Sequence, residues 1–364
     1  MNFKIIKSHN EFLKLEPVWN DLLSRSGSNH IHLTFEWMNL WIKYFGKETS
    51  LFVIVCEEGD KITAIAPMAI HKVGKLFRNT LKFRQLTLLG NGFQDFSDFI
   101  VTGSRDEILQ GFLKVIIENE DQWDEINFKQ INTASPNFEF FQSFAAGENY
   151  EQSFDEIIGC PFLRIDGTFE DYYKSIGGSW RKKNERNIRK LEAIGEIKFE
   201  ANTEMSEELY KDILEMNIER NKRNGRRSIL LEEPKISFIK KMLPMFAEKK
   251  WIRVFTLRHN GKLLTYSISF DYNNRIYRWN TSFNLDYYDY SVGRIITKYI
   301  IRFCFENKYE ISDWMAGVED HKFHWTSEQT FNYNFFIAKK NLKSLIAKKY
   351  SETKKEILSK SNVQ

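Results

Sequence analysis

Residues 251–283 read WIRVFTLRHNGKLLTYSISFDYNNRIYRWNTSF, and they are the clearest indication of the fold. Three runs rich in β-branched and aromatic residues, at 251–258, 262–271 and 275–283, are separated by HNG and YNN. Asn and Gly at such positions favour the tight turns of β-hairpins. The stretch therefore predicts three consecutive antiparallel strands.

Apolar periodicity on both sides of this meander predicts the remainder of one domain. The expected elements are a strand at 196–202, helices at 205–224 and 232–248, a helix at 291–307, a strand at 309–314 and a strand pair across 328–338. This mixture predicts an α/β protein of the α+β kind, in which a mixed, mostly antiparallel sheet is flanked by helices.

The first half of the chain has the same order of elements, although its residues differ. Its expected elements are helices at 10–25, 35–46 and 105–119 and strands at 51–57, 62–71, 82–90 and 124–131, followed by a short strand at 159–166 and a helix at 168–193 that ends before Gly195. The repeated order predicts tandem domains at 1–160 and 161–340. A basic tail at 341–364 follows them.

Composition indicates a globular protein of the cytoplasm. Hydrophobic residues make up 42% of the 364 residues, enough for a sizeable core. Cys56, Cys160 and Cys304 are far apart and suggest no disulfide framework. The N-terminal MNFKIIKSHNEF lacks a signal-peptide pattern, and no run of about 18 apolar residues predicts a membrane span. With a net charge of only +4, no DNA partner is expected.

The sequence DWMAGVEDHKFHW at 313–325 concentrates charged and aromatic residues after a predicted strand. His321 and His324 follow two acidic residues, which raises the question of a metal site. Zinc needs three or four ligands, and the chain has no C-x-x-C or H-E-x-x-H motif, so no metal is expected. The remaining alternatives are an acid–base centre, since histidine titrates near neutrality, and an ordinary charged turn.

The sequence YDYSVGRIITKYI at 288–300 predicts the start of the helix that follows the meander. The free N–H groups of a helix N-terminus bind anions such as a pyrophosphate. Gly293 allows a close approach, and Ser291 is expected to cap the helix. The candidate cofactor-binding residues are Tyr290, Ser291, Val292, Gly293 and Arg294. A plain capped helix is the alternative.

The sequence SWRKKNERNIRKLE at 179–192 places several cations on one side of a predicted helix. Lys182, Arg186 and Arg189 are spaced i, i+4 and i+7, so they form one basic stripe. This stripe is expected either to bind substrate phosphates or to grip an anionic carrier. A solvated charged face is the alternative.

Several strings in register resemble a known family: LTFEWMNLWIKYFG, IAPMAI followed by LTLLGNGFQDFSDFIV, GCPFLRIDGTFEDYYKSIGGSWRKKNERNIRKLE, YSVGRII and DWMAGVEDHKFHW. Together they look like the CelD-type, cellulose-biosynthesis-associated acyltransferases of the GNAT fold, which are in turn similar to the Fem transferases that build peptidoglycan bridges. The resemblance spans about residues 10–338. It implies two GNAT domains in tandem, with acyl transfer in the second.

The resemblance also implies substrate-binding residues. It carries over Arg181, Lys182 and Arg186 as matching positions, of which Arg186 is preferred. Asp95 and Asp98 match an aspartate pair of the family, where carboxylates would attract an acceptor amine. An Asx-rich turn is the alternative for these two residues.

In the loop at 313–325, the resemblance implies an active site. The matching positions are Asp313, Gly317, Lys322 and Trp325, of which Asp313 is expected to be catalytic and Trp325 to bind substrate. A lysine follows this turn in Fem-like transferases, so Lys322 is expected to neutralise an oxyanion or a phosphate. His321, which stands where an aromatic residue is usual, is expected to act as general base, with Asp271, Asp286 and Asp289 as alternatives.

The expected function is an acyl-CoA-dependent N-acyltransferase that acts on an amino group of a cell-envelope or polysaccharide-related acceptor, such as a small molecule or glycan precursor. GNAT proteins usually have a second small residue after Gly293, and this chain has none. That departure leaves two alternatives open. In the first alternative, the acyl donor is acyl carrier protein or aminoacyl-tRNA. In the second, the chain is a non-catalytic binding protein. No membrane contact is expected.

Overall fold

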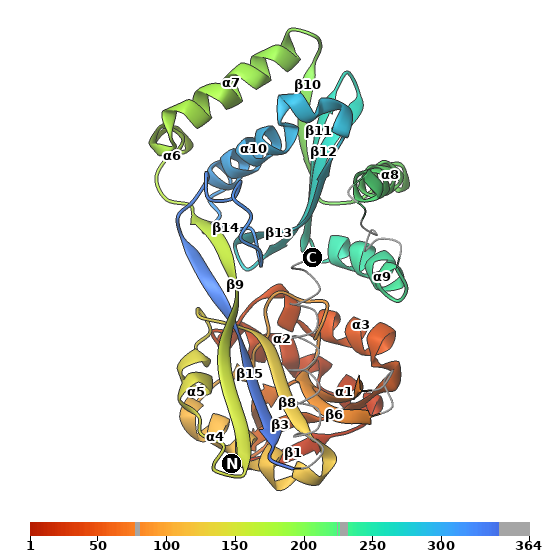
Figure 1. Ribbon diagram of the computed structural model, residues 1–364, viewed down its shortest axis with the longest axis vertical. Coiled ribbons are helices and arrows are strands. Elements are labelled where there is room, and N and C mark those ends of the chain that lie inside the picture. Colours follow the sequence, from red (N-terminus) through yellow and green to blue (C-terminus); the bar gives the residue numbers. More distant parts are fainter. Residues whose placement is uncertain (77–80, 224, 226–231, 342–364) are drawn as a thin grey trace, which may run out of the picture. The chain divides into compact units, whose positions relative to one another are not determined.

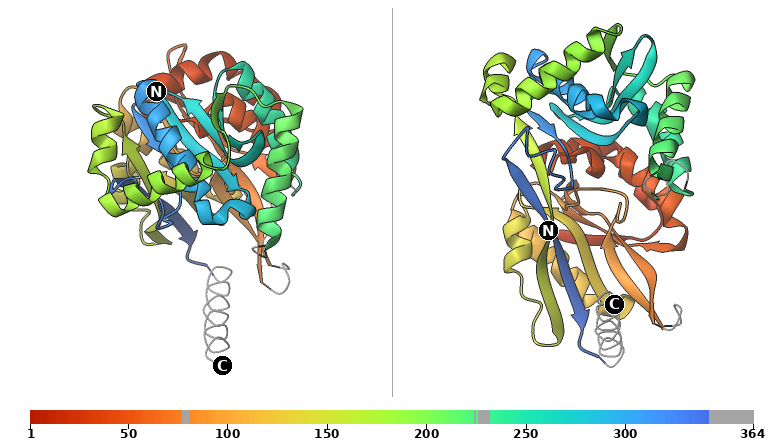
Figure 2. Two further views of the ribbon diagram at one scale, coloured as in Figure 1. Left: turned by 90° about the horizontal axis from the view of Figure 1, so that it is seen from above. Right: turned by 45° about the horizontal axis from the view of Figure 1, so that its top comes forward.

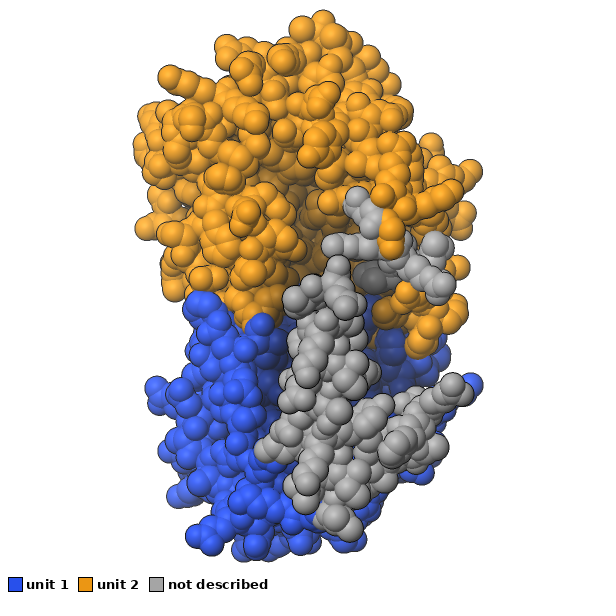
Figure 3. Space-filling view, viewed as in Figure 1, with its two compact units in different colours: residues 1–157, 331–364 blue, residues 158–330 orange. Residues whose placement is uncertain are grey.

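The computed structural model of the chain describes residues 1–76, 81–223, 225 and 232–341. The chain divides into two compact units, which Figure 3 colours separately. Unit 1 comprises Met1–Ile157 together with the chain from Phe331, and unit 2 comprises Ile158–Thr330. Each unit contains sheet strands flanked by helices (Figure 1). The predicted fold class is confirmed.

Unit 1 contains a small sheet in the order β1-β3-β4-β7 and a row of strands in the order β15-β8-β6-β5-β2. Its strands are β1 (Asn2–Ile6), β2 (Thr49–Leu51), β3 (Val53–Glu58), β4 (Lys61–Ala66), β5 (Met68–Leu76), β6 (Leu81–Leu88), β7 (Ile100–Val101), β8 (Glu125–Asn132) and most of β15 (Gln329–Lys339). Its helices are α1 (His9–Leu13), α2 (Glu16–Arg25), α3 (Phe35–Phe45), α4 (Arg105–Glu118) and α5 (Phe138–Ser143). Phe112, Trp123 and Phe335 lie in its apolar core.

Unit 2 contains strands in the order β10-β11-β12-β13-β14-β9. These strands are β9 (Tyr150–Arg164), whose first part belongs to unit 1, β10 (Ile197–Asn202), β11 (Ile252–His259), β12 (Lys262–Tyr272), β13 (Arg275–Phe283) and β14 (Ile311–Asp313). Its helices are α6 (Phe169–Ser175), α7 (Gly178–Glu192), α8 (Glu207–Arg223), α9 (Lys235–Glu248) and α10 (Val292–Glu306). The meander predicted from 251–283 is β11-β12-β13, and it is antiparallel.

Helix α10 covers one face of the unit 2 sheet, and α8 and α9 cover the other (Figures 1 and 2). The apolar side of α10, which includes Ile296 and Ile300, packs on Phe255 and Leu264 of the sheet. Residues 285–290 form a short 3-10 helix between β13 and α10. The end of β13 is therefore connected to the first turn of α10 by this short helix.

The single helix expected at 168–193 is wrong, because the chain forms α6 and α7 there. Ile176 and Gly177 between them have extended backbone conformations, with ψ angles of 144° and 125°. Two consecutive glycines, Gly177 and Gly178, have the low helix propensity that allows such a break. Helix α7 is consequently a separate element.

Two further predictions are corrected. The helix expected at 10–25 is α1 and α2, since Pro17 lies in the first turn of α2, where proline is tolerated. The strand pair expected across 328–338 is the single strand β15. Asn332, a residue type typical of turns, is instead buried in β15 and donates its amide to the Asp95 carbonyl. Periodicity also missed β1, α5 and the first part of β9.

Of the basic tail expected at 341–364, all but the first residue lies outside the described part of the chain. Within the described part, none of the helices has both the length and the apolar character needed to cross a bilayer.

Candidate active site

Strands β13 and β14 separate soon after they begin. They pair in parallel only through residues 275–277 and 311–313. Next to this contact, β13 has a β-bulge at Trp279, because Arg278 and Asn280 face neighbouring positions on β12. A bulge bends its strand and increases the local twist. The bulge thus turns the rest of β13 away from β14.

We call this place the strand fork and define it as residues 278–283 of β13 and the loop 314–325 that follows β14. Backbone groups of 278–283 on this side are not used by β14. The carbonyls of Thr281 and Ser282 accept hydrogen bonds from the side chains of Arg220 and Thr265. The remaining groups on this side are candidates to hydrogen-bond an extended ligand, as in β-strand addition. The predicted donor strand and the predicted active-site loop are thereby brought to one place in unit 2.

The first turn of α10 begins beside the end of β13. Ser291 has a left-handed backbone conformation, with φ 53°, and its hydroxyl makes no cap hydrogen bond. The expected side-chain cap is therefore wrong, and the Ser291 carbonyl accepts the backbone N–H of Arg294 instead, at 2.8 Å. The first N–H groups of a helix have no partner within it, so those of Val292 and Gly293 are candidates to bind an anion.

Neighbouring residues fix this helix start. A Cβ added at Gly293 would lie 3.8 Å from the ring of Phe283. The Asn187 amide of α7 donates to the Tyr290 carbonyl at 3.0 Å. The side chain of Val292 is fully buried, so it can offer a ligand only its backbone.

Arg294 belongs to a stack of side chains. Its guanidinium carbon lies 3.4 Å from the ring centre of Trp180 on α7. The ring of His324 lies 3.6 Å from the same ring centre at 20°. The Nε and Nη1 atoms of Arg294 are buried and have no hydrogen-bond partner. Trp180 thus joins the first turn of α10 to the loop 314–325.

Lys322 is held inside the loop. Only 7% of its surface is exposed. Its ammonium group donates to the carbonyls of Gly317 and Trp314, at 3.1 and 3.3 Å, and forms an ion pair with Glu319 at 2.8 Å. The three donors of the ammonium group thus have three acceptors. This geometry favours a lysine that shapes the loop.

Asp313 and Trp325 shape the same loop. The Asp313 side chain accepts the backbone N–H of Met315 at 2.6 Å, next to the left-handed turn at Met315, with φ 58°. Trp325 is buried in an apolar cluster with Trp314, and its carbonyl accepts the hydroxyl of Tyr172. The expected substrate-binding Trp325 therefore presents little of its ring surface.

His321 lies on the exposed side of this loop. Partial burial lowers its pKa, Glu319 opposes that change, and the positive charges of Lys322, Arg278 and Arg220 lower the pKa further. The imidazole is therefore neutral at pH 7 and can accept a proton. Of the alternative bases, Asp271 is already engaged by Arg253 and Tyr309, each at 2.6 Å.

The other two alternative bases lie before α10. Asp286 forms an exposed ion pair with Lys262 at 3.6 Å. Asp289 lies on the exposed surface of the same 3-10 helix. Neither belongs to the strand fork as defined.

The predicted basic residues of α7 divide into two groups. Arg181 donates to the carbonyls of Tyr173 and Lys174 and so closes the end of α6. Lys182 and Arg186 are exposed, and neither forms an ion pair within the described residues. The exposed stripe remains available to an anionic partner.

Asp95 and Asp98 lie in unit 1, apart in sequence and unit from the residues above. Asp98 is 2% exposed and accepts hydrogen bonds from Ser28, Ser135 and Asn137 at 2.6–2.7 Å. Burial raises its pKa, while those hydrogen bonds act in the opposite direction. The arrangement is that of a structural carboxylate. Asp95 is half-buried.

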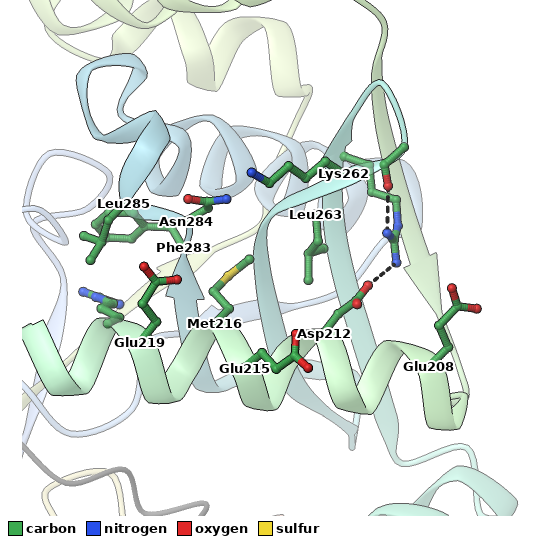
Figure 4. Close-up of a pocket in the computed structure, with 13 residues that line it drawn as sticks. Glu208, Asp212, Glu215, Met216, Glu219, Lys262, Leu263, Phe283, Asn284 and Leu285 are labelled. Atoms are coloured by element: carbon green, nitrogen blue, oxygen red, sulfur yellow. Dashed lines mark hydrogen bonds and ion pairs between the residues drawn. The ribbon is translucent and has the colours of Figure 1, made fainter.

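A cavity of about 390 Å³ lies between α8 and the ends of β12 and β13 (Figure 4). Four acidic side chains of α8 line it: Glu208, Asp212, Glu215 and Glu219. Arg220 also lines the cavity, and its guanidinium carbon lies 4.4 Å from the ring centre of Phe283. Because Phe283 of the strand fork also lines the cavity, the cavity borders the strand fork.

Sequence reasoning missed this cavity and one side chain, Arg278 of β13. Arg278 lies two residues after Ile276 and therefore on the same, apolar side of its strand. A charged residue at such a position was the sequence signal that could have identified it. The described residues include no group of three or more side chains suited to hold a metal ion.

Residues 178–323 match the model of a family described as an acetyltransferase (GNAT) domain. FemX is similar in structure, with 11% sequence identity, a TM-score of 0.63, and coverage of 92% of this chain and 97% of FemX. A tandem GNAT protein from the clavulanic acid biosynthesis pathway is 12% identical, with a TM-score of 0.50 and coverage of 93% and 98%.

The C-terminal domain of a putative lysylphosphatidylglycerol synthetase from Agrobacterium fabrum is 11% identical, with a TM-score of 0.54 and coverage of 90% and 92%. No curated protein has a significantly similar sequence. At these identities the solved structures establish the fold alone. The chain has a fold similar to that of tandem GNAT proteins, and its residues 178–323 match the model of the GNAT acetyltransferase domain.

Proposed function

We propose that the protein is an N-acyltransferase that takes its acyl group from acyl-CoA. The observation that carries this proposal is the strand fork, where the edge of β13 that β14 leaves unpaired is followed, after the 3-10 helix 285–290, by the uncapped N-terminus of α10. A thioester with an extended amide-containing arm and a pyrophosphate fits these two features in that order. The match of residues 178–323 to an acetyltransferase domain supports the same reading.

In this proposal the pantetheine amides pair with residues 278–283, and the pyrophosphate meets the backbone of 291–294. Arg294, stacked on Trp180, supplies the positive charge beside the pyrophosphate. In unit 1 the segment 91–105 contains Asp95, Asp98 and no comparable cation before Arg105, so the donor is assigned to unit 2.

The reaction is direct attack of a neutral amine on the thioester carbonyl. A C–N bond forms, the C–S bond breaks, and the CoA thiolate leaves and takes up a proton. His321, neutral at pH 7, accepts the proton that the amine loses. Lys322 and Asp313 position the loop that carries His321. Charge neutralisation of the oxyanion by Lys322 requires that its contact with Glu319 opens.

The acceptor is an amine. The acidic side of α8 that lines the cavity attracts an ammonium group before it loses its proton (Figure 4). The exposed Arg186 is proposed to bind a phosphate on that acceptor, and Asp95 is retained as an acceptor-binding candidate. The names FemX and lysylphosphatidylglycerol synthetase, together with the CelD-type resemblance, support a cell-envelope or polysaccharide-related acceptor.

A carrier-bound donor is the second candidate, and the exposed stripe of α7 favours it. Lys182, Lys183, Arg186, Arg189 and Lys190 are exposed and form no ion pair within the described part of the chain. Such a surface suits acyl carrier protein or aminoacyl-tRNA, and binding would weaken steeply with salt. If the donor is acyl-CoA, whose phosphates would meet α10, substitutions in the exposed stripe of α7 should weaken donor binding less.

Turnover with acetyl-CoA and a panel of amines, followed by release of free CoA thiol, tests the proposal. The panel contains amino sugars, their phosphates and small peptides. Release of CoA thiol that depends on an amine would support the proposed acyltransferase activity. Arg186→Ala should raise the KM for the acceptor with little change in kcat. Release that requires acyl carrier protein or aminoacyl-tRNA, and is absent with acyl-CoA, would assign the second candidate instead.

A further inference from the structure

A buried cation, Arg278, contacts α10 one turn after the helix begins. It lies on β13 directly before the bulge, and only 8% of its surface is exposed. Burial lowers the pKa of Arg278 to about 10, so the guanidinium is still charged at pH 7. Its Nη2 donates to the hydroxyl of Thr297 on α10 at 2.9 Å, whereas its Nε and Nη1 have no hydrogen-bond partner in the described chain. A single hydrogen bond therefore joins this cation to α10.

A chain of hydrogen bonds runs from Arg278 to the start of α10. The Thr297 hydroxyl that accepts from Arg278 donates in turn to the carbonyl of Gly293 at 2.8 Å. The same peptide group carries the N–H of Arg294, which donates to the carbonyl of Ser291 at 2.8 Å. Hydrogen bonds in series polarise one another and make their members more rigid. Arg278 thereby acts on the turn that the phosphates of the proposed donor would meet.

The hydrogen bond to Thr297 does not need a charged donor, because a neutral glutamine amide could donate to the same hydroxyl. Arg278 pairs with no carboxylate among the residues that the structure describes. Arg253 of β11, by contrast, is largely buried and pairs with Asp271 at 2.6 Å. A buried charge without a counter-charge costs free energy, and a negative ligand nearby would offset that cost. The contrast indicates that the charge of Arg278 serves a ligand.

The charge can act on a ligand at the helix start without touching it. Thr297 lies four residues, or roughly 6 Å of helix rise, beyond Gly293. At a distance of roughly 10 Å and an effective dielectric constant of about 20, a unit charge changes the affinity for a phosphate on the order of tenfold. Salt screens a buried charge less than an exposed one. The hydrogen bonds and the charge of Arg278 therefore both favour an anion at the first turn of α10.

We propose that Arg278 is a positioning residue for the phosphates of the donor. Through Thr297 it holds the first turn of α10, and its charge adds to the positive end of the helix macrodipole. This inference rests on the proposed acyl-CoA donor and states what makes the same turn bind the donor's phosphates tightly. Neither Arg278 nor Thr297 touches the donor.

Calorimetric titration of the full chain with acetyl-CoA, and displacement of acetyl-CoA by S-acetylpantetheine, test the inference. The two thioesters share the acyl group and the arm, and only acetyl-CoA carries phosphates. Arg278→Gln should weaken binding of acetyl-CoA about tenfold and leave the affinity for S-acetylpantetheine within about twofold. Arg278→Lys keeps the charge and should recover part of the loss. Thr297→Val breaks the chain of hydrogen bonds and should also weaken acetyl-CoA selectively, by a smaller factor.

Three results would contradict the inference. Equal binding of acetyl-CoA by the wild type and Arg278→Gln would overturn it and leave the acyl-CoA donor standing. An equal loss for both thioesters would do the same, because Arg278 would then support the fold rather than the phosphates. Failure of the wild type to bind acetyl-CoA would overturn both proposals together. If the Arg278 variants do not fold, Thr297→Val decides, since an equal effect of this variant on the two thioesters would overturn the inference.

Melting temperatures separate binding from structure. Because Arg278 is buried without a counter-charge, Arg278→Met should leave the melting temperature of the ligand-free protein equal or higher while it weakens acetyl-CoA. Arg253→Gln is the matched control, because it removes an arginine with a carboxylate partner from the same sheet. It should lower the melting temperature and leave the ratio of the two affinities unchanged. The same pattern in Arg278→Met would identify Arg278 as merely structural and overturn the inference.

Discussion

The guanidinium of Arg294 on α10 lies against the ring of Trp180 on α7, with 3.4 Å between the guanidinium carbon and the ring centre. His324 stacks on the same ring at 3.6 Å, and two groups so close to one ring must take opposite faces. The ring of Trp180 is therefore held between the first turn of α10 and the loop that contains His321. Such stacking fixes where the charge of Arg294 points.

We expect Trp180→Ala to weaken binding of CoA about tenfold, because Arg294 loses the surface that orients it. Trp180→Phe keeps an aromatic ring, so its loss of binding free energy for CoA should be less than half of the loss in Trp180→Ala. Calorimetric titration with CoA measures both. Equal affinities for wild type and Trp180→Ala would mean that the stack is unrelated to the donor.

Lys322→Ala should lower kcat by about 10²–10³, the range seen for loss of a preorganised charge contact. It should also lower the free energy of unfolding by about 1–3 kcal/mol, since the carbonyls of Trp314 and Gly317 lose their donor. Steady-state kinetics and urea unfolding measure the two effects. Lys241→Ala, which changes an exposed lysine on α9 of the same unit, is the control.

The partner of Lys322 separates its two roles. Glu319→Gln weakens the ion pair and frees the ammonium group. If Lys322 positions the loop, this variant should turn over more slowly than the wild type. A faster variant would show that Lys322 acts directly on the substrate once Glu319 releases it.

The rate should depend on pH through His321. A general base works in its deprotonated form, and burial together with Lys322, Arg278 and Arg220 lowers the pKa of this imidazole despite Glu319. The rise of kcat/KM with pH should therefore be centred below the usual histidine value of about 6.5 and be complete at pH 7. His321→Gln should remove this rise and cost about 10²–10⁴ in rate, whereas His9→Gln should change neither. A rise centred above pH 7 would point to another base.

Asp98→Ala should destabilise the protein rather than change substrate binding. The variant leaves the donors of Ser28, Ser135 and Asn137 without their acceptor in a buried site. We expect a loss of at least about 3 kcal/mol in the free energy of unfolding. Asp60→Ala, in an exposed turn, is the control. A stable Asp98→Ala protein with a raised acceptor KM would restore the substrate-binding role.

Local patterns were sufficient for most of the fold. The hairpin turns after Arg258 and Asp271 and the amphipathic α10 were predicted, because each depends on neighbouring residues. Long-range contacts were not. β15 is one strand where a strand pair was expected, and the buried Asn332 within it donates to the carbonyl of Asp95, which is distant in sequence. The domain ranges 1–160 and 161–340 stay a prediction, and the compact units differ from them because β15 belongs largely to unit 1.

The candidate site was predictable as a set of segments but not as a set of roles. The sequence marked the loop 313–325 and the turn at Gly293, and the structure brings the loop and β13 together at the strand fork. The sequence could not reveal that the ammonium group of Lys322 forms its ion pair within its own loop, with Glu319. Nor could it reveal that two nitrogens of Arg278 are buried and that this arginine pairs with no carboxylate of the described residues, because such contacts depend on the folded chain.

The central claim is that the first turn of α10 in unit 2 receives the phosphates of an acyl-CoA. Titration of wild type, Gly293→Asp and Ser104→Asp with acetyl-CoA tests it most directly. Both variants place a carboxylate at a helix start, since Ser104 precedes α4 of unit 1. We predict that Gly293→Asp weakens binding at least about 100-fold through charge repulsion and lost backbone access, while Ser104→Asp binds as the wild type does. Undiminished binding by Gly293→Asp would contradict the claim.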